Sequence, residues 1–445
     1  MSRFWRLTKL ALPIIGLNIL QVLAMVVDTA MLGRLPHATA ALAGTGYAVQ
    51  VLFLLMVFMI GLTVGTVALV ARAHGAGKRD RVDHVFSQSI VLCLIVSLVV
   101  AVLGNIVGGP IIDLLGADEN TRGPGLLYLR PMLVGVFFSY LNILLAAVLR
   151  GVRNTTLPFA VAIVANVLNV GLNYVLILGN LGFPALGTFG AALGTVISQG
   201  VALALLTALL LRDWEPNVSL RLPKTFDSAL IWQLFRVGSP AAMDMVVFNA
   251  GFLSIVGMLG SLDQTAVAAH SVGLRIQALA FVPGMAISQV TGALVGNALG
   301  ADEPREARMV LRVAMVLCLA IMTIATVVLM GLAPQLTLIF NIEPTSQLGV
   351  YTVMWIRLLG SCMPFVAIYL AFVGVFQGSG YTRIPLTINV IVTTLMIPAS
   401  YTMGFPLEWG VFGIWVAFPA SFLVKASLAW GFYLRGTWAQ PVNST

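Results

Sequence analysis

The sequence predicts an all-α membrane protein of twelve transmembrane helices, arranged as two six-helix lobes. The first observation behind this prediction is composition. Of the 445 residues, 59% are hydrophobic and only 9% are charged, and the mean hydropathy is +1.00. A soluble domain carries about 25% charged residues, so this chain has too little polar surface to face water. The other two observations are a series of long apolar segments and an internal repeat.

The apolar segments have the length of membrane-spanning helices. Stretches such as 87–107 and 310–332 can each cross about 30 Å of hydrocarbon in helical form. The short alternating strands of a membrane barrel do not occur in the sequence. The breaks between apolar segments predict helices over 11–34, 41–71, 87–108, 124–149, 157–178, 187–211, 231–260, 266–296, 309–333, 350–376, 385–404 and 410–434.

Positive charge predicts the orientation of these helices. Lys and Arg gather in alternate loops, for example at Lys78, Arg153 and Arg305, and both termini fall on the same side as those loops. Because positive loops face the cytoplasm, we expect both termini there, in a bacterial-type cytoplasmic membrane. The net charge of +8 is then explained by topology and does not call for a nucleic-acid partner. The three cysteines lie in apolar runs, which predicts neither disulfides nor a metal site.

The two halves of the chain repeat each other at a constant offset in sequence number. Pro13 matches Pro240, and Pro158 matches Pro385. Further matches at the same offset are Gly33 with Gly260, Arg130 with Arg357 and Gly151 with Gly378. Since each half holds six predicted spans, the repeats are parallel and related by an axis along the membrane normal. We expect lobes at 1–212 and 231–445, a cytoplasmic linker at 213–230, and a carrier rather than a channel.

Four motifs then resemble the multidrug and toxic compound extrusion (MATE) family. They are Val27-Asp28-Thr29-Ala30-Met31-Leu32-Gly33, Leu149-Arg150-Gly151 followed by Pro158, Ala268-Ala269-His270-Ser271, and Gly296-Asn297-Ala298-Leu299-Gly300-Ala301. The resemblance covers nearly the whole chain. It implies a twelve-helix, two-lobe exporter of organic cations or drugs, coupled to inward proton or sodium flow, with Asp28 as the coupling residue. We expect a monomer in the lipid bilayer with a small organic substrate, no enzyme activity, and no cofactor or metal beyond H⁺ or Na⁺.

Asp28 and Asp244 are the two acids, of sixteen, that lie well inside predicted spans. A charged carboxylate at the bilayer centre costs about 2.5–3.5 kcal/mol on insertion scales. Such an acid has to be neutralised by a proton or a cation, or stabilised by hydrogen-bond donors. Neutralisation by a proton or a cation suits an ion-coupled switch, whereas stabilisation by hydrogen-bond donors describes a structural acid. At the repeat offset Asp28 matches Ile255 and Asp244 matches Leu17, so neither acid has a twin.

Three amides accompany Asp28 as candidate cation-coupling residues. Asn166, Asn169 and Asn173 have i, i+3, i+7 spacing and share one helical face. Their oxygens could ligate sodium or orient a carboxylate, although asparagine also joins membrane helices by hydrogen bonds. In some members of the resembled family, the position matched to Asn173 is an aspartate that works with the first acid. Asparagine here predicts a single-acid switch assisted by amides.

Further polar residues in the spans form a candidate second cation or substrate site. They are Asp244, Asn249, His270, Arg275 and Gln277. The alternative for Asp244 is an ion pair with Arg275, and for His270 it is helix packing or capping. Candidate substrate-cavity residues are Gln21, Met25 and Met243. Methionine makes plastic apolar surfaces, although methionine on lipid-facing helices is the commoner case.

Two other functions compete with ion-coupled export. One is the flipping of a lipid-linked precursor, which usually requires extra helices and a strongly basic cavity. The other is an intramembrane enzyme that uses Asp28 and Asp244 as a dyad, although these acids lie at different depths. No nucleotide-binding P-loop occurs in the sequence, so ATP would have to act through another subunit.

Overall fold

The structure is a computed structural model that describes residues 3–220, 223, 225–338 and 342–439. Residues 221, 222 and 224 of the predicted linker, and the last six residues of the chain, lie outside this part. The described residues form α-helices and one short 3₁₀ helix, without a β-strand. This agrees with the predicted fold class.

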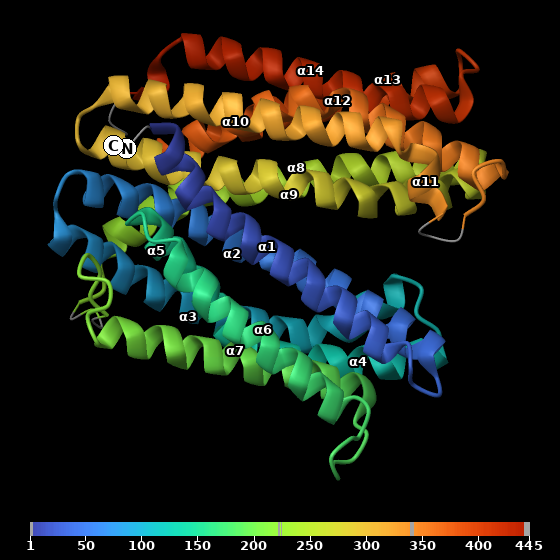
Figure 1. Cartoon of the computed structure of the whole chain (residues 1–445), viewed down its shortest axis with the longest axis horizontal. Helices are drawn as coiled ribbons and strands as arrows, with labels where there is room; N and C mark the ends of the chain where they lie inside the picture. The colour runs from blue at the N-terminus through green and yellow to red at the C-terminus, as the bar shows by residue number, and fades with distance from the viewer. Residues whose placement is uncertain (1–2, 221–222, 224, 339–341, 440–445) are drawn as a thin grey trace. The chain divides into compact units, whose positions relative to one another are not determined.

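The helices appear in two consecutive series (Figure 1). Those of the first half are α1 (Arg3–Leu32), α2 (Ala38–Gly75), α3 (Arg79–Leu114), α4 (Glu119–Val134), α5 (Val136–Gly151), α6 (Thr156–Leu176) and α7 (Gly187–Leu211). Those of the second half are α8 (Ser228–Leu262), α9 (Gln264–Gly300), α10 (Pro304–Gly331), α11 (Ala333–Leu338), α12 (Gln347–Gly378), α13 (Arg383–Gly404) and α14 (Gly410–Leu434), followed by η1 (Thr437–Ala439).

The described helices account for twelve membrane spans when bent segments are paired. Ten are long and apolar enough to cross a membrane, and two more spans are broken. The prediction of one continuous helix over 124–149 is wrong, because α4 and α5 meet at Gly135 with a bend of 54°. Pro131 interrupts the hydrogen-bond ladder one turn earlier, and Gly135 lacks the side chain that would collide with Val196. The helix predicted over 266–296 is also bent, by 46° between Gln277 and Ala280.

The chain divides into two compact units. The first unit is Leu12–Ser239, and the second unit runs from Pro240 onward and includes the start of α1 up to Ala11. In the first unit α2 packs against α3, α4 and α5, while α7 packs against α4, α5 and α6. In the second unit α12 packs against α9, α10 and α14, and α13 packs against α14.

Glycines allow the central helices of each unit to approach closely, as is common between membrane helices. In the first unit a Cβ on Gly44 of α2 would lie 2.4 Å from the carbonyl oxygen of Thr121 in α4. In the second unit a Cβ on Gly378 of α12 would lie 2.0 Å from the carbonyl oxygen of Gly292 in α9. The helix pairs could not keep these separations with any larger residue.

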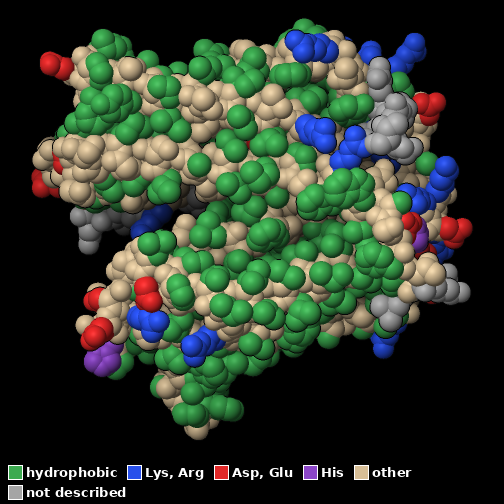
Figure 2. Space-filling view, turned by 180° about the vertical axis from the view of Figure 1, so that it is seen from behind, with side chains coloured by type: hydrophobic (Ala, Val, Ile, Leu, Met, Phe, Trp, Pro, Cys, Tyr) green, Lys and Arg blue, Asp and Glu red, His purple; other side chains and the backbone are tan. Residues whose placement is uncertain are grey.

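Hydrophobic side chains cover the long helical faces, as Figure 2 shows for one side of the molecule. Most of the charged side chains visible there lie toward the ends of the helices. Large apolar residues on these faces include Leu98, Val167 and Leu253, which are 65%, 70% and 73% exposed. Such surfaces are stable in contact with lipid rather than water.

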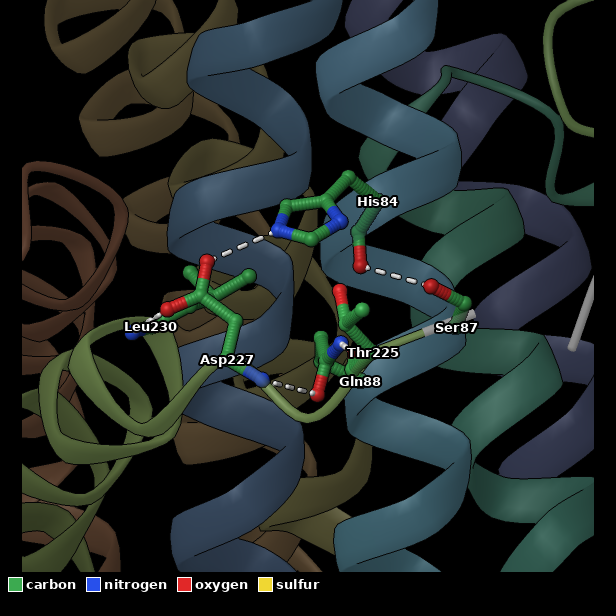
Figure 3. A network of polar contacts seen from close by, with 6 residues as sticks. All are labelled: His84, Ser87, Gln88, Thr225, Asp227 and Leu230. Carbon is green, nitrogen blue, oxygen red and sulfur yellow. Dashed lines mark hydrogen bonds and ion pairs between the residues drawn. The ribbon is translucent and has the colours of Figure 1, made fainter. Parts of the chain in front are cut away.

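The segment before α8 is tied to the start of α3 (Figure 3). The Gln88 side chain donates from Nε2 to the Thr225 carbonyl oxygen at 2.7 Å and accepts at Oε1 from the Asp227 amide at 3.3 Å. His84 Nε2 lies 2.8 Å from Asp227 Oδ2. Two turns of α3 therefore hold the chain just where the first helix of the second repeat begins.

Asp227 is also the residue that starts α8. Its Oδ1 accepts a hydrogen bond from the Leu230 amide at 2.9 Å, which is the geometry of an N-cap. The hydrogen bond from His84, followed by that from Leu230, holds the pKa of the Asp227 carboxyl below its ordinary value of 3.8. One side chain thus caps a helix and anchors the linker.

We expect Asp227→Ala to lower the Tm of the purified protein at neutral pH. The variant loses an N-cap worth about 1 kcal/mol and the contact with His84. Because the folded-state pKa lies below the unfolded value, this stability is present above the unfolded pKa and is lost as pH falls through the folded pKa. The Tm difference should therefore shrink below about pH 4, as thermal unfolding at several pH values would reveal.

The matched control is Glu303→Ala. Glu303 is the exposed N-cap residue of α10 and makes no side-chain cap hydrogen bond. It should leave Tm nearly unchanged at every pH. An equal loss of Tm in both variants, or an Asp227→Ala effect that persists undiminished in acid, would contradict the assignment.

Candidate functional site

Asp28 of the first unit is bound by an amide from a distant part of the chain. It lies four residues before the end of α1 and is half-buried. Asn173 of α6 is fully buried and donates from Nδ2 to Asp28 Oδ1 at 2.5 Å. The two residues are 145 positions apart in the sequence. The fold therefore supplies a neutral donor, rather than a counter-charge, to the carboxylate.

This contact continues as a chain of polar side chains into α7. Asn173 Nδ2 also donates to Asn169 Oδ1 at 3.2 Å, and Asn169 Nδ2 donates to Thr195 Oγ1 at 3.4 Å. Sequence reasoning did not include Thr195. Its hydroxyl donates to the Ala191 carbonyl oxygen, as threonines inside helices often do, so the sequence alone gives no sign of a further role.

Gly194 makes room for this arrangement. A Cβ at Gly194 would lie 2.2 Å from Asn173 Oδ1, closer than any real contact. That oxygen is buried and has no hydrogen-bond partner among the described residues. The site therefore combines a carboxylate, a hydroxyl and an unsatisfied amide oxygen, which are the hard ligands that a small cation prefers.

The other residues predicted around Asp28 lie outside this chain of contacts. Asn166 is half-buried and donates from Nδ2 to the Ala162 carbonyl oxygen of its own helix at 2.8 Å. Gln21 and Met25 are exposed on α1. They precede Asp28 by seven and three residues, so all three occupy one face of the helix.

The second unit holds an equivalent pair. Asn389 of α13 donates from Nδ2 to Asp244 Oδ1 of α8, and these residues are again 145 positions apart. The helices α8 and α13 are the repeat counterparts of α1 and α6. The offset from Asp28 to Asp244 is shorter, however, than the offset from Pro13 to Pro240. The difference amounts to about three helical turns, so the pair keeps the same face but shifts by roughly 16 Å along its helices.

A buried lysine distinguishes the second pair from the first. Lys425 of α14 is 3% exposed, and it interacts electrostatically with Asp244. The sequence pattern assigned no role to Lys425 and did not single out Asn389. The predicted alternative partner of Asp244, Arg275, is exposed, and the described residues include no ion pair between the two.

The remaining predicted residues of the second unit are dispersed. Asn249 donates from Nδ2 to the Met245 carbonyl oxygen of its own helix at 2.8 Å. His270 is fully buried, with its ring centroid 4.7 Å from that of Trp355, as expected of a packing residue. Gln277 is 5% exposed, whereas Met243 is 51% exposed. In the described part of the chain no three His, Cys, Asp or Glu side chains gather as they would around a metal ion.

A comparison with protein families finds one match that extends over most of the chain. The sequence model of the MatE family matches residues 13–175 and again residues 240–402. The two matches begin at Pro13 and Pro240, which are the first pair of the repeat found in the sequence.

Several bacterial relatives align along nearly the full length. The "Probable multidrug resistance protein NorM" of Thermotoga maritima is 29% identical over 439 residues, which cover 97% of this chain and 92% of the relative. The "Multidrug resistance protein MdtK" of Edwardsiella ictaluri is 27% identical over 457 residues, which cover 99% and 98%.

Solved structures have the same fold. One is a "Crystal structure of MATE in the bent conformation", which matches with a TM-score of 0.89 at 21% identity and covers 98% of this chain and 97% of that one. Another is the "Outward-facing conformation of a multidrug resistance MATE family transporter of the MOP superfamily", with a TM-score of 0.89 at 20% identity and the same coverage. The matches over both repeats show that this chain belongs to the MatE family, the MATE family that its motifs resemble.

Proposed function

We propose that the chain is an antiporter that exports amphipathic, often cationic organic compounds by alternating access, driven by inward flow of protons or sodium. The relatives named as multidrug resistance proteins support drug extrusion. The observation that supports the coupling is the contact between Asp28 and Asn173 inside a span, where the described residues form no ion pair with Asp28. The proposed driving ion binds there.

The chemistry of the site favours a small cation or a proton. A bound proton neutralises the Asp28 carboxylate directly. A sodium ion would need oxygen ligands, and the site offers the carboxylate, the Thr195 hydroxyl and Asn173 Oδ1. Rotation of the Asn173 amide would exchange its donor for its oxygen, so the same side chain can serve the ion-free and the ion-bound states.

Neutralisation of Asp28 gives the ion a way to change the conformation. While the carboxylate is charged, its hydrogen bond to Asn173 holds α1 against α6. Once an ion is bound, this contact is weaker and α1 can repack. A ligand shifts an equilibrium only by its different affinity for the two states, and the difference here is the presence or absence of the Asp28–Asn173 contact.

The cargo would bind beside Asp28 or Asp244. Gln21 and Met25 share the Asp28 face of α1, and Met243 is adjacent to Asp244 on α8. Asp244 is the proposed second contact for a cation or for the cargo, with Asn249, His270, Arg275 and Gln277 in the same unit.

The positive loops support a location in a bacterial cytoplasmic membrane, with both termini on the cytoplasmic side. We propose that the protein works as a monomer with lobes at 1–212 and 231–445.

Asp28→Asn is expected to reduce ion-driven efflux at least tenfold, because the amide cannot exchange a proton or balance a cation. Efflux of a fluorescent organic cation from proteoliposomes would be measured after a sodium jump and, separately, after a pH jump. The two jumps distinguish the driving ions.

The matched control is Asp80→Asn, an identical change at an exposed position in the first turn of α3. Its efflux should equal that of the wild type. Full coupled efflux by Asp28→Asn under both gradients would refute the central role of Asp28. Lipid translocation by the wild type, without any efflux of organic cations, would favour the flippase hypothesis instead.

Gly194→Ala is expected to weaken the apparent affinity for the coupling ion by roughly tenfold, or about 1.4 kcal/mol. The added methyl group would displace Asn173 Oδ1, which its Cβ would approach to 2.2 Å. The dependence of efflux on ion concentration measures this change. Gly171→Ala in α6 is the matched control, because its Cβ would meet no atom within 4 Å. Equal ion dependence in both variants would exclude Asn173 from the ion site.

A further inference from the structure

The ammonium of Lys425 lies among aromatic rings. Its Nζ is 4.9 Å from the ring centroid of Phe422, 5.1 Å from that of Phe248 and 5.9 Å from that of Tyr369. Aromatic faces attract cations, and groups of such rings are a recurring way to bind organic ammonium ligands. Phe248, Tyr369 and Phe422 together form an aromatic cage. Three elements of the second unit, α8, α12 and α14, contribute to it.

An acid completes the cage. Asp244 lies one helical turn before Phe248 on α8, so both side chains occupy one face. Lys425 and Asp244 interact across space without a direct ion pair in the described structure. The lysine is thus held by the rings as well as by the field of the carboxylate. A cage with an adjacent carboxylate is what an amphipathic organic cation would require.

The aromatic cage continues into a larger group of rings. Phe422 lies 5.2 Å from Phe418 between ring centroids, and Phe418 lies 5.6 Å from Trp355 and 5.0 Å from Phe252. The ring pairs in the described part of the first unit are Phe137–Phe138 and Trp232–Phe235, away from Asp28 in the sequence. Asp28 of the first unit leads into a chain of amide and hydroxyl groups, whereas the lysine that interacts with Asp244 in the second unit lies among aromatic rings.

We propose that Lys425 is a tethered cation that occupies the position of the substrate's cationic group in the second unit. An organic cation would bind between the aromatic cage and Asp244 only when the lysine side chain withdraws. The flexible four-carbon stem of lysine allows such a movement. This inference rests on the proposed function, since it takes organic cations to be the cargo. It also assigns Phe248, Tyr369 and Phe422 as residues that determine specificity for aromatic or quaternary cations.

The first test is binding of tetraphenylphosphonium to the purified full-length protein, without any ion gradient. Lys425→Met removes the competing charge and keeps a flexible chain of similar length. We expect it to bind the probe about tenfold more tightly than the wild type, within the range of cation–π contributions. Lys425→Arg keeps a cation in the cage and should bind the probe as the wild type does. Lys78→Met, the same change at an exposed loop position, is the matched control.

The outcomes separate this inference from the proposed function. Equal or weaker binding by Lys425→Met than by the wild type overturns the role of Lys425 but leaves organic cations as cargo. Failure of both proteins to bind the probe refutes the organic-cation cargo and the inference together. Loss of coupled efflux in Asp28→Asn concerns the other unit and changes neither result.

The second test uses the wild type and does not depend on a lysine variant that folds. A membrane-permeant amine-acylating reagent is applied with and without saturating tetraphenylphosphonium, and modification of each lysine is measured by mass spectrometry. Displacement by the probe should increase the modification of Lys425, while the exposed Lys9 and Lys78 remain unchanged. Unchanged or reduced modification of Lys425 would show that the probe does not displace it.

Discussion

A carboxylate inside a bilayer can keep its charge only where the protein replaces the water that it has lost. In the first unit Asn173 provides that replacement, and in the second unit Asn389 does so. An amide donates hydrogen bonds but carries no charge, so it stabilises the acid without neutralising it. Lys425 adds a positive charge near Asp244 alone. The two acids therefore have the same kind of hydrogen-bond donor, and in the described structure a lysine accompanies only the second.

The repeat preserves the helices while moving the site along them. A shift of about three turns changes the depth of a side chain and leaves its face unchanged. Asp28 lies four residues from the end of α1, whereas Asp244 lies near the middle of α8. In the proposed mechanism the two acids can therefore serve different ligands, a small ion near one end of the first unit and an organic cation midway through the second.

The sequence was sufficient for the spans, the offset of the repeat and the two intramembrane acids, because apolar length and the cost of burying charge are local properties. It named Asn173 among the amides that accompany Asp28, but it did not supply Asn389 as the partner of Asp244, because that side chain comes from a helix 145 positions away. The repeat does not identify Asn389 either. At the offset that pairs Pro13 with Pro240, Asn173 matches Ser400 and not Asn389. The bend at Gly135 was missed for a similar reason. Pro131 is visible in the sequence, but the approach of Val196 from α7, which requires a glycine at position 135, is a tertiary contact that a single apolar run does not record.

Among the ten unbroken spans, the two helices that carry the acids have the smallest share of buried residues. In their most apolar windows α1 and α8 have 11% and 17% of residues buried, against 50% for α2 and 67% for α12. Little apolar area has to separate when such helices repack, so a modest change in free energy can move them. Neutralising one intramembrane carboxylate is worth about 2.5–3.5 kcal/mol on insertion scales, which corresponds to a roughly 70- to 400-fold change in an equilibrium constant. In the proposed mechanism, an ion bound at Asp28 would use up to this much free energy to shift α1 between two states, while the glycine contacts keep the central helices of the unit in place.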